Sequence, residues 1–250
     1  MKLREVQEIM RKHGGNLDLS YTPIDSLPVD LNVVRNLILN HSLIKILPDG
    51  LTVCGNLDLS DTPIETLPKD LTVIGNVYLR NTPIKSLSKG LIVGGNLILG
   101  DTPIKSLSEG LIVGGNLDLS DTPIETLPDG FTVGGNLYLN GTPIDSLPEK
   151  LTVGGNLVLS YTPIKTLPKD ITVGGNLYLD GTSIESLPVG LNVVRNLVLS
   201  HSQIKTLPDG LTVGGDLDLR NTPIKILPED LIVGGNLYLN TIWFIYLIAI

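Results

Sequence analysis

Hydrophobic positions recur with a fixed, 20-residue period from Gly15 to Asn240, with no insertion or deletion. This gives eleven complete units and the start of a twelfth, and the unit at 115–134 reads GNLDLSDTPIETLPDGFTVG. A fixed period of this length is typical of repeat proteins, in which stacked units share one continuous core. Six positions of each unit stay apolar, and in the second unit they are Leu37, Leu39, Ile44, Leu47, Leu51 and Val53.

The spacing of these positions predicts the structure of one coil. Leu37 and Leu39 alternate with an outward residue, which indicates a short strand with one buried face. Leu51 and Val53 alternate in the same way and allow a second short strand on the opposite side of the coil. Pro48 can neither continue a helix nor donate to a sheet, and no window of the repeats has helical periodicity long enough for a helix. Neighbouring coils should therefore pair their strands in parallel, roughly 4.8 Å apart.

The apolar positions and the residues between them resemble the leucine-rich-repeat pattern L-x-L-x-x-N-x-L-x-x-L-P, with threonine in place of the usual asparagine. In one unit the pattern is carried by Leu117, Leu119, Thr122, Ile124, Leu127 and Pro128. The resemblance covers residues 15–240 and is greatest to short, 20-residue repeats of bacterial or phage type. It implies a mainly β leucine-rich-repeat solenoid with one long parallel concave sheet, and protein binding without a cofactor.

The two ends of the chain depart from the repeat. Apolar residues of 1–14, such as Val6 and Met10, fall on one face of a helix that would end at Gly14, so this segment is predicted to be a short N-terminal helical cap. The apolar tail 241–250 is far below the ~20 residues needed to span a bilayer. Three interpretations of it stay open: a cap, an oligomerisation strand that joins chains end to end, or a truncated end. Its β-prone, low-charge sequence favours association.

Three further positions repeat in almost every unit. A threonine or serine such as Thr122 is expected to bond backbone groups at the corner, within and between coils. An asparagine before the first leucine, replaced only by Asp216, is expected to form a ladder of stacked amides. A third position, here called the charged column, carries charges of both signs, which indicates a solvated face. Its first residues are Asp25, Lys45 and Glu65. Cys54, the single cysteine, is interpreted as a small apolar filler.

The residue between the two leucines of each strand, here called the lane, points outward and varies from unit to unit. It runs Asp18, Ile38, Asp58, Tyr78, Ile98, Asp118, Tyr138, Val158, Tyr178, Val198, Asp218 and Tyr238. Tyrosine is frequent in binding hot spots, although tyrosine, isoleucine and valine also simply suit strands. The predicted partner-binding residues are Tyr78, Ile98, Tyr138, Val158, Tyr178, Val198 and Tyr238, and 138–198 is preferred because it is apolar without interruption.

A block from Asn32 to Val53 reappears eight units later, with Arg195 and His201 in place of Arg35 and His41. Copying of a gene segment explains this repetition without function, and twin sites for a two-fold partner are the alternative. The net charge of −8 disfavours nucleic acid and anionic membranes, both of which require clustered cations.

The charged N-terminal segment is no secretory signal, which favours a cytoplasmic protein and leaves secretion by a signal-less route open. No phosphate loop, metal-ligand motif or nucleophile motif is present, so no enzymatic activity is expected. The sequence predicts a non-catalytic protein-interaction scaffold. The alternative is a carbohydrate- or surface-binding structural solenoid, which would use the same aromatic and amide groups.

Overall fold

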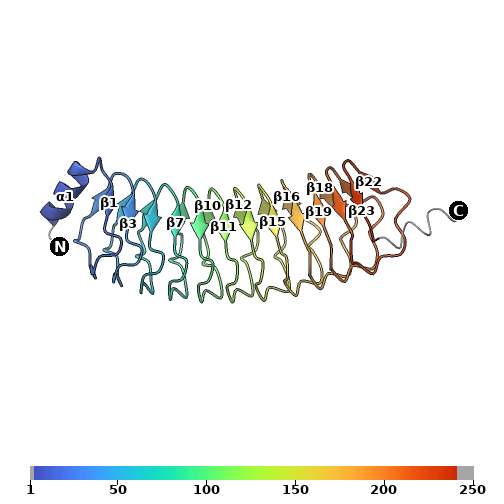
Figure 1. Cartoon of the computed structure of the whole chain (residues 1–250), viewed down its shortest axis with the longest axis horizontal. Coiled ribbons are helices and arrows are strands. Elements are labelled where there is room, and N and C mark those ends of the chain that lie inside the picture. The colour runs from blue at the N-terminus through green and yellow to red at the C-terminus, as the bar shows by residue number, and fades with distance from the viewer. Residues whose placement is uncertain (1–2, 241–250) are drawn as a thin grey trace. The chain divides into compact units, whose positions relative to one another are not determined.

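The computed structural model describes residues 3–240, so the predictions made for the tail at 241–250 lie outside the described residues. The chain divides into two compact units, which are described separately. The first unit runs to Ile124 and includes Val133–Gly135, and the second comprises Glu125–Thr132 and the chain from Asn136. In both units the 20-residue repeats form stacked coils of a mainly β solenoid, as the sequence predicts (Figure 1).

One helix, α1 (Leu3–Lys12), precedes the first coil and lies beside strand β1 (Leu17–Asp18) (Figure 1). Val6 and Met10 are buried on its inner face. The chain leaves the helix through glycines with positive φ, and the amide of Gly15 donates to the carbonyl of Met10 over 2.8 Å. Within residues 3–240 this is the only helix, which confirms the predicted N-terminal helix and the absence of helices from the repeats.

The first unit contains two rows of parallel strands, one on each side of the coils. In its first sheet, each strand pairs with its equivalent in the next coil; the strands are β1, β3 (Leu37–Ile38), β5 (Leu57–Asp58), β7 (Val77–Tyr78), β9 (Leu97–Ile98) and β11 (Leu117–Asp118). Its second sheet is the second row of strands predicted from Leu51 and Val53. The strands are β2 (Asn32–Val33), β4 (Thr52–Val53), β6 (Thr72–Val73), β8 (Ile92–Val93) and β10 (Ile112–Val113), and β10 pairs with Val133 of β12 (Thr132–Val133).

The second unit repeats this arrangement with one interruption. Its first sheet is continuous and contains β13 (Leu137–Tyr138), β15 (Leu157–Val158), β17 (Leu177–Tyr178), β19 (Leu197–Val198), β21 (Leu217–Asp218) and β23 (Leu237–Tyr238). Its second row is broken into two parts: β14 (Thr152–Val153) with β16 (Thr172–Val173), and β18 (Asn192–Val193) with β20 (Thr212–Val213) and β22 (Ile232–Val233).

The six repeated apolar positions form the core of each coil. In the second coil all six side chains are buried, and none is more than 3% exposed. Each fully buried leucine or isoleucine contributes about 1.5–3 kcal/mol of hydrophobic free energy, which a single coil could not obtain without its neighbours. The core predicted from the sequence is confirmed.

Hydrogen bonds fix the corner and the stacking of the coils. The hydroxyl of Thr122 donates to the carbonyl of Leu119 over 2.7 Å, and eight other threonines make the equivalent bond within their own coil. The asparagine ladder joins successive coils, because the backbone amide of Asn56 donates to the Oδ1 atom of Asn36 over 2.8 Å. Asp216 serves equally well, since its Oδ1 accepts the amide of Asn236 over 2.7 Å.

Candidate functional site

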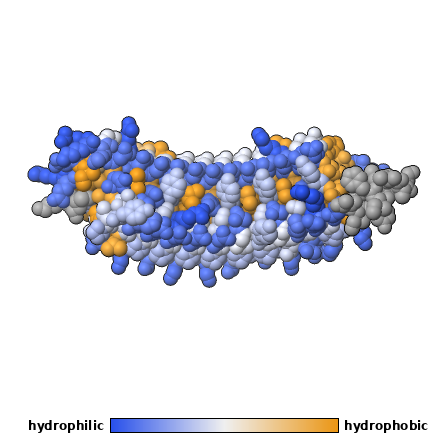
Figure 2. All heavy atoms as spheres, in the orientation of Figure 1, coloured by the Kyte–Doolittle hydropathy of each residue, from blue (hydrophilic) through white to orange (hydrophobic). Residues whose placement is uncertain are grey.

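The lane of the second unit lies on six neighbouring strands of one sheet. The pairing places Tyr138 beside Val158, Val158 beside Tyr178 and Tyr178 beside Val198. These four side chains are half-buried on the outer face of the sheet, whereas the leucines before and after them are buried. Apolar patches lie between paler, more polar ones along this face in Figure 2. The structure therefore brings together the residues preferred from the sequence, in one uninterrupted row.

The tyrosines of the lane are held in place by the asparagine ladder. Asn176 donates from Nδ2 to the hydroxyl of Tyr178 over 3.1 Å, while its Oδ1 accepts the amide of Asn196 over 3.0 Å. Asn136 bonds the hydroxyl of Tyr138 in the same way over 3.0 Å. Each ring is thus fixed at both ends, which lowers the rotamer entropy that it would lose on binding.

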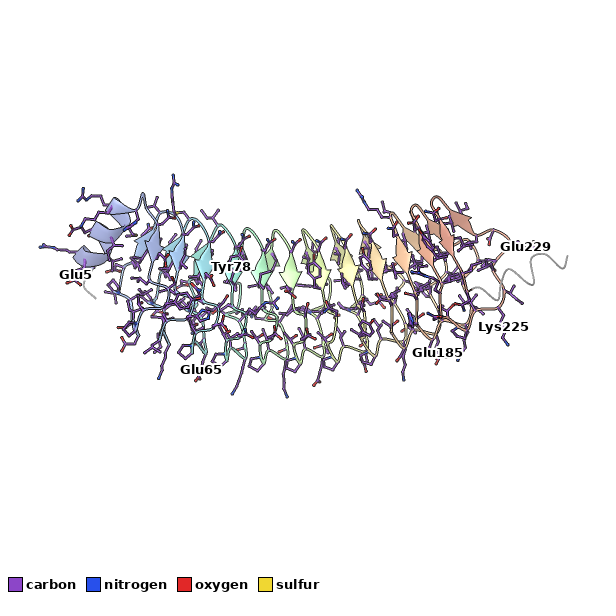
Figure 3. The ribbon with its side chains drawn as sticks, in the orientation of Figure 1. Glu5, Glu65, Tyr78, Glu185, Lys225 and Glu229 are labelled. Carbon is purple, nitrogen blue, oxygen red and sulfur yellow. The ribbon has the colours of Figure 1, made fainter. Side chains whose placement is uncertain are left out.

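In the first unit the apolar part of the lane is shorter. Tyr78 and Ile98 are neighbours, and an aspartate adjoins them on each side, Asp58 and Asp118. The Tyr78 hydroxyl accepts from Asn76 over 3.1 Å, and Figure 3 shows this tyrosine on strand β7. These two predicted residues are adjacent, but they form a patch of only two side chains.

Two arginines that the sequence analysis did not single out cover two of the four aspartates of the lane. Arg80 donates to Asp118 over 2.6 Å and to Asp101 over 3.1 Å, and its guanidinium lies over Gly100, where a side chain would crowd it. Arg220 makes two side-chain bonds to Asp218, the shorter of 2.6 Å. Asp118 and Asp218 are consequently only 9% and 8% exposed, although the lane points outward.

The end of the second unit combines a carboxylate, a guanidinium and an aromatic ring. The guanidinium carbon of Arg220 lies 5.4 Å from the centroid of the Tyr238 ring, a cation–π distance. Burial raises the pKa of Asp218, but the hydrogen bonds and positive charge of Arg220 outweigh this effect and leave the pKa below its ordinary value. The ring of Tyr238 is therefore covered by a guanidinium of its own chain, whereas no cation–π contact covers the rings of Tyr138 and Tyr178 within the described residues.

Two other sequence interpretations have clear outcomes. Cys54 is exposed, so its interpretation as an apolar filler is wrong. The inward residue of strand β4 is Val53, and the position that follows must point outward. The charged column is exposed throughout, as predicted, and Figure 3 shows Glu65 and Glu185 on the return segments, away from the strands. Lys205 and Glu185 form a 2.8 Å ion pair in it.

The duplicated block does not produce two equal sites. The ring of His41 stacks on Tyr21 with centroids 4.5 Å apart, whereas His201 has Asn221 as its neighbour, with Nε2 and Nδ2 2.9 Å apart. Within residues 3–240, no three histidine, cysteine, aspartate or glutamate side chains are grouped so that they could bind a metal ion. No helix of the described chain has the length and apolar character to cross a membrane.

No protein-family model and no curated protein matches this sequence. Among solved structures, the chain is similar to Toll in the Drosophila Toll–Spatzle complex, with 18% identity and a TM-score of 0.49, covering 82% of this chain and 37% of that one. It is also similar to YopM from Yersinia enterocolitica, with 18% identity and a TM-score of 0.34, covering 95% and 73% of the two chains. A Shigella effector leucine-rich-repeat domain gives 15% identity, a TM-score of 0.31 and coverage of 96% and 87%. With its LxLxxTxIxxLP pattern folded into parallel coils, one coil for each repeat, the chain has the architecture of a leucine-rich-repeat solenoid.

Proposed function

We propose that this chain is a non-catalytic scaffold that binds a protein partner through the outer face of its first sheet. The observation that carries the proposal is the row Tyr138, Val158, Tyr178 and Val198 on neighbouring strands. It combines apolar contact area with rings whose hydroxyls are already fixed by Asn136 and by the equivalent asparagine two coils later. Rigid, half-exposed tyrosines are the residues from which binding hot spots are commonly built.

Tyr78, Ile98 and Tyr238 are proposed to have secondary roles at most. Tyr78 and Ile98 form a patch bounded by aspartates, and Tyr238 already has the guanidinium of Arg220 beside its ring. Cytoplasmic residence stays a prediction from the sequence. The carbohydrate alternative uses the same tyrosine and asparagine groups, and an experiment must separate it from protein binding.

The test compares a lane variant with a control variant of equal stability. Tyr138→Ala with Tyr178→Ala removes both rings, whereas Thr152→Ala with Thr172→Ala changes outward residues of the second sheet in the same unit. A partner captured by the unaltered chain should lose about thirtyfold in affinity for the lane variant, since hot-spot truncations cost about 2 kcal/mol or more. The control should bind normally. Equal binding by both variants contradicts the proposal.

A glycan array with the same three proteins addresses the alternative. Tyrosine-dependent binding to an oligosaccharide, without any tyrosine-dependent protein partner, would replace the scaffold by a carbohydrate-binding solenoid. Melting temperatures of the variants must be measured first, because a loss of binding is informative only where the coils remain folded.

A further inference from the structure

The first-sheet face binds guanidinium groups of its own chain. Arg220 lies between a carboxylate of its own coil, Asp218, and the ring of Tyr238 on the next strand. In the first unit, Arg80 likewise reaches the lane carboxylate of Asp118 over 2.6 Å. A carboxylate with an adjacent aromatic ring is a good receptor for arginine, because the planar fork donates to the oxygens while its face stacks on the ring.

A third carboxylate of this face lacks such an arginine. Asp180 has the same position in its coil as Arg220 has in its own, two residues after the lane residue Tyr178. Its Oδ1 accepts the hydroxyl of Ser160 over 2.6 Å. Across residues 3–240, no lysine, arginine or histidine forms an ion pair with Asp180. The carboxylate is therefore oriented by a hydroxyl and keeps Oδ2 for an external donor.

The ring of Tyr161 lies over Gly181, the residue that follows Asp180. The backbone amide of Tyr161 donates to the carbonyl of Asp180 over 3.0 Å. Its ring covers Gly181, because a Cβ atom built on that glycine would lie 2.6 Å from Cδ1 of the ring. On the other side the equivalent residue is Gly141, which has no side chain that could cover the ring. Asp180 and Tyr161 thus place a carboxylate and an aromatic ring on adjacent coils of the same unit, as Asp218 and Tyr238 do around Arg220.

The ring of Tyr161 is exposed and has no partner side chain stacked on it in the described chain. The residue's φ of +60° is shared by the same corner position of the other coils, and 74% of the residue is exposed. The equivalent Tyr21 of the first unit has a ring partner in His41, whereas in the described chain Tyr161 has neither a ring nor a cation beside it.

We propose that Asp180 and Tyr161 form a receptor for an arginine side chain of the protein partner, an inference that rests on the proposed function. The guanidinium donates to Oδ2 of Asp180 and stacks on the free face of Tyr161. The adjoining lane residues, Val158 and Tyr178, contact the apolar residues of the same segment. The net charge of −8 favours such a basic partner, since it attracts cationic segments over a distance at low salt.

The test uses two peptides of equal length and charge, a Gly-Arg repeat and a Gly-Lys repeat, titrated into the full chain at low salt. The arginine peptide should bind several times more tightly, because an ammonium can neither stack as well nor donate as a fork. Asp180→Asn should weaken arginine-peptide binding about tenfold, in keeping with a hydrogen-bonded charge pair. Tyr161→Asn, which accepts the left-handed backbone, should weaken it about threefold, as expected for loss of a cation–π contact.

The matched control is Asp170→Asn, which removes the same charge from an exposed position earlier in the chain. It should change binding less than Asp180→Asn does. The proposed receptor would be refuted if Asp170→Asn and Asp180→Asn weakened binding of the arginine peptide equally, or if the arginine and lysine peptides bound the unaltered chain equally. The lane variant Tyr138→Ala distinguishes this proposal from the proposed function. If capture of a protein partner depends on Tyr138 but not on Asp180, the arginine receptor is refuted and the scaffold function is not.

Discussion

A methyl group added at Gly115 should destabilise the chain by pushing two coils apart. A Cβ atom built there would collide with Oδ1 of Asn96 and would lie 2.8 Å from the carbonyl carbon of Gly95. That Oδ1 accepts the amide of Asn116 over 2.7 Å, so it belongs to the ladder that joins the coils. The glycine before each asparagine is therefore explained by the close approach of the preceding coil.

The chain contains two natural exceptions, Arg35 and Arg195, which occupy this glycine position. There the ladder bond lengthens to 3.2 Å for the amide of Asn36 and to 3.0 Å for the amide of Asn196. The other ladder bonds measure 2.7–2.9 Å. The second row of strands in the second unit also breaks between β16 and β18, next to Arg195. A side chain at this position thus loosens the stacking without abolishing it.

The expected magnitude for Gly115→Ala follows from three contributions. Weakening one inter-coil hydrogen bond costs about 1 kcal/mol, and forcing a methyl group into a packed contact costs about 1–3 kcal/mol. The smaller entropy of the unfolded alanine chain offsets about 0.4–1 kcal/mol. Gly115→Ala should therefore lower the free energy of unfolding by about 2 kcal/mol, measured by chemical denaturation.

A double-mutant cycle with Asn96→Ala isolates the cause. Asn96→Ala removes the Oδ1 atom that the new methyl group would meet, so Gly115→Ala should cost less in that background, by about 1 kcal/mol. Part of the cost should remain, because the carbonyl of Gly95 is also close. If the losses of stability in the two single variants add up to the loss in the double variant within about 0.5 kcal/mol, the contact with the Asn96 side chain does not cause the effect of Gly115→Ala.

Three further predictions concern the core, a strained corner and acid stability. Leu137→Asp, which buries an unpaired carboxylate where the leucine is 0% exposed, should cost several kcal/mol, whereas Tyr138→Asp should be nearly neutral; equal melting shifts would show that the strand faces are wrongly assigned. Lys150→Gly should raise stability by about 1 kcal/mol, since Lys150 has a φ of +59°, and an unchanged melting temperature would contradict this. The lowered pKa of Asp218 stabilises the fold above the ordinary carboxyl pKa, and this stability is lost as the pH falls through the folded-state pKa. Arg220→Gln should therefore lose more stability at neutral pH than in acid, where only the contact with Tyr238 remains, and a loss that does not change with pH would exclude the ion pair as the cause.

The repeat made most of the fold predictable. Because the period is fixed, each position has many copies, and alternation around Leu37 and Leu39 assigns the inward face of every first strand. The same alternation extended past Val53 places Cys54 outside. Its interpretation as a filler was wrong because Cys54 was compared with the residues at the same position of other repeats, Val34 and Ile74, instead of with the strand period. The corner hydroxyls followed from the need to satisfy backbone groups, and the asparagine ladder followed from the regular recurrence of that residue before the first leucine.

Contacts between different repeat positions could not be predicted in the same way. Arg80 reaches an aspartate two coils further on because Gly100, in the coil between them, leaves the space. Neither residue follows the repeat, and their relation depends on which side chains are stacked and how far each extends. Asp180 and Tyr161 are of the same kind, since no sequence spacing relates a corner tyrosine to a carboxylate at a different position of the following coil. The charged and aromatic contacts of the first-sheet face thus arise at positions whose residue type varies between repeats.

The asparagine ladder connects the scaffold to the face that it presents. Asn176 uses its oxygen to hold the next coil and its nitrogen to hold the ring of Tyr178. The carboxylate of Asp216 shows that the first role requires only an acceptor, whereas the second requires the donor of an amide. Because one side chain performs both roles, the stacking that stabilises the coils also fixes the lane tyrosines. A face made rigid by its own fold loses little entropy on binding, and a change of one lane residue alters the contact surface without disturbing the coils beneath it.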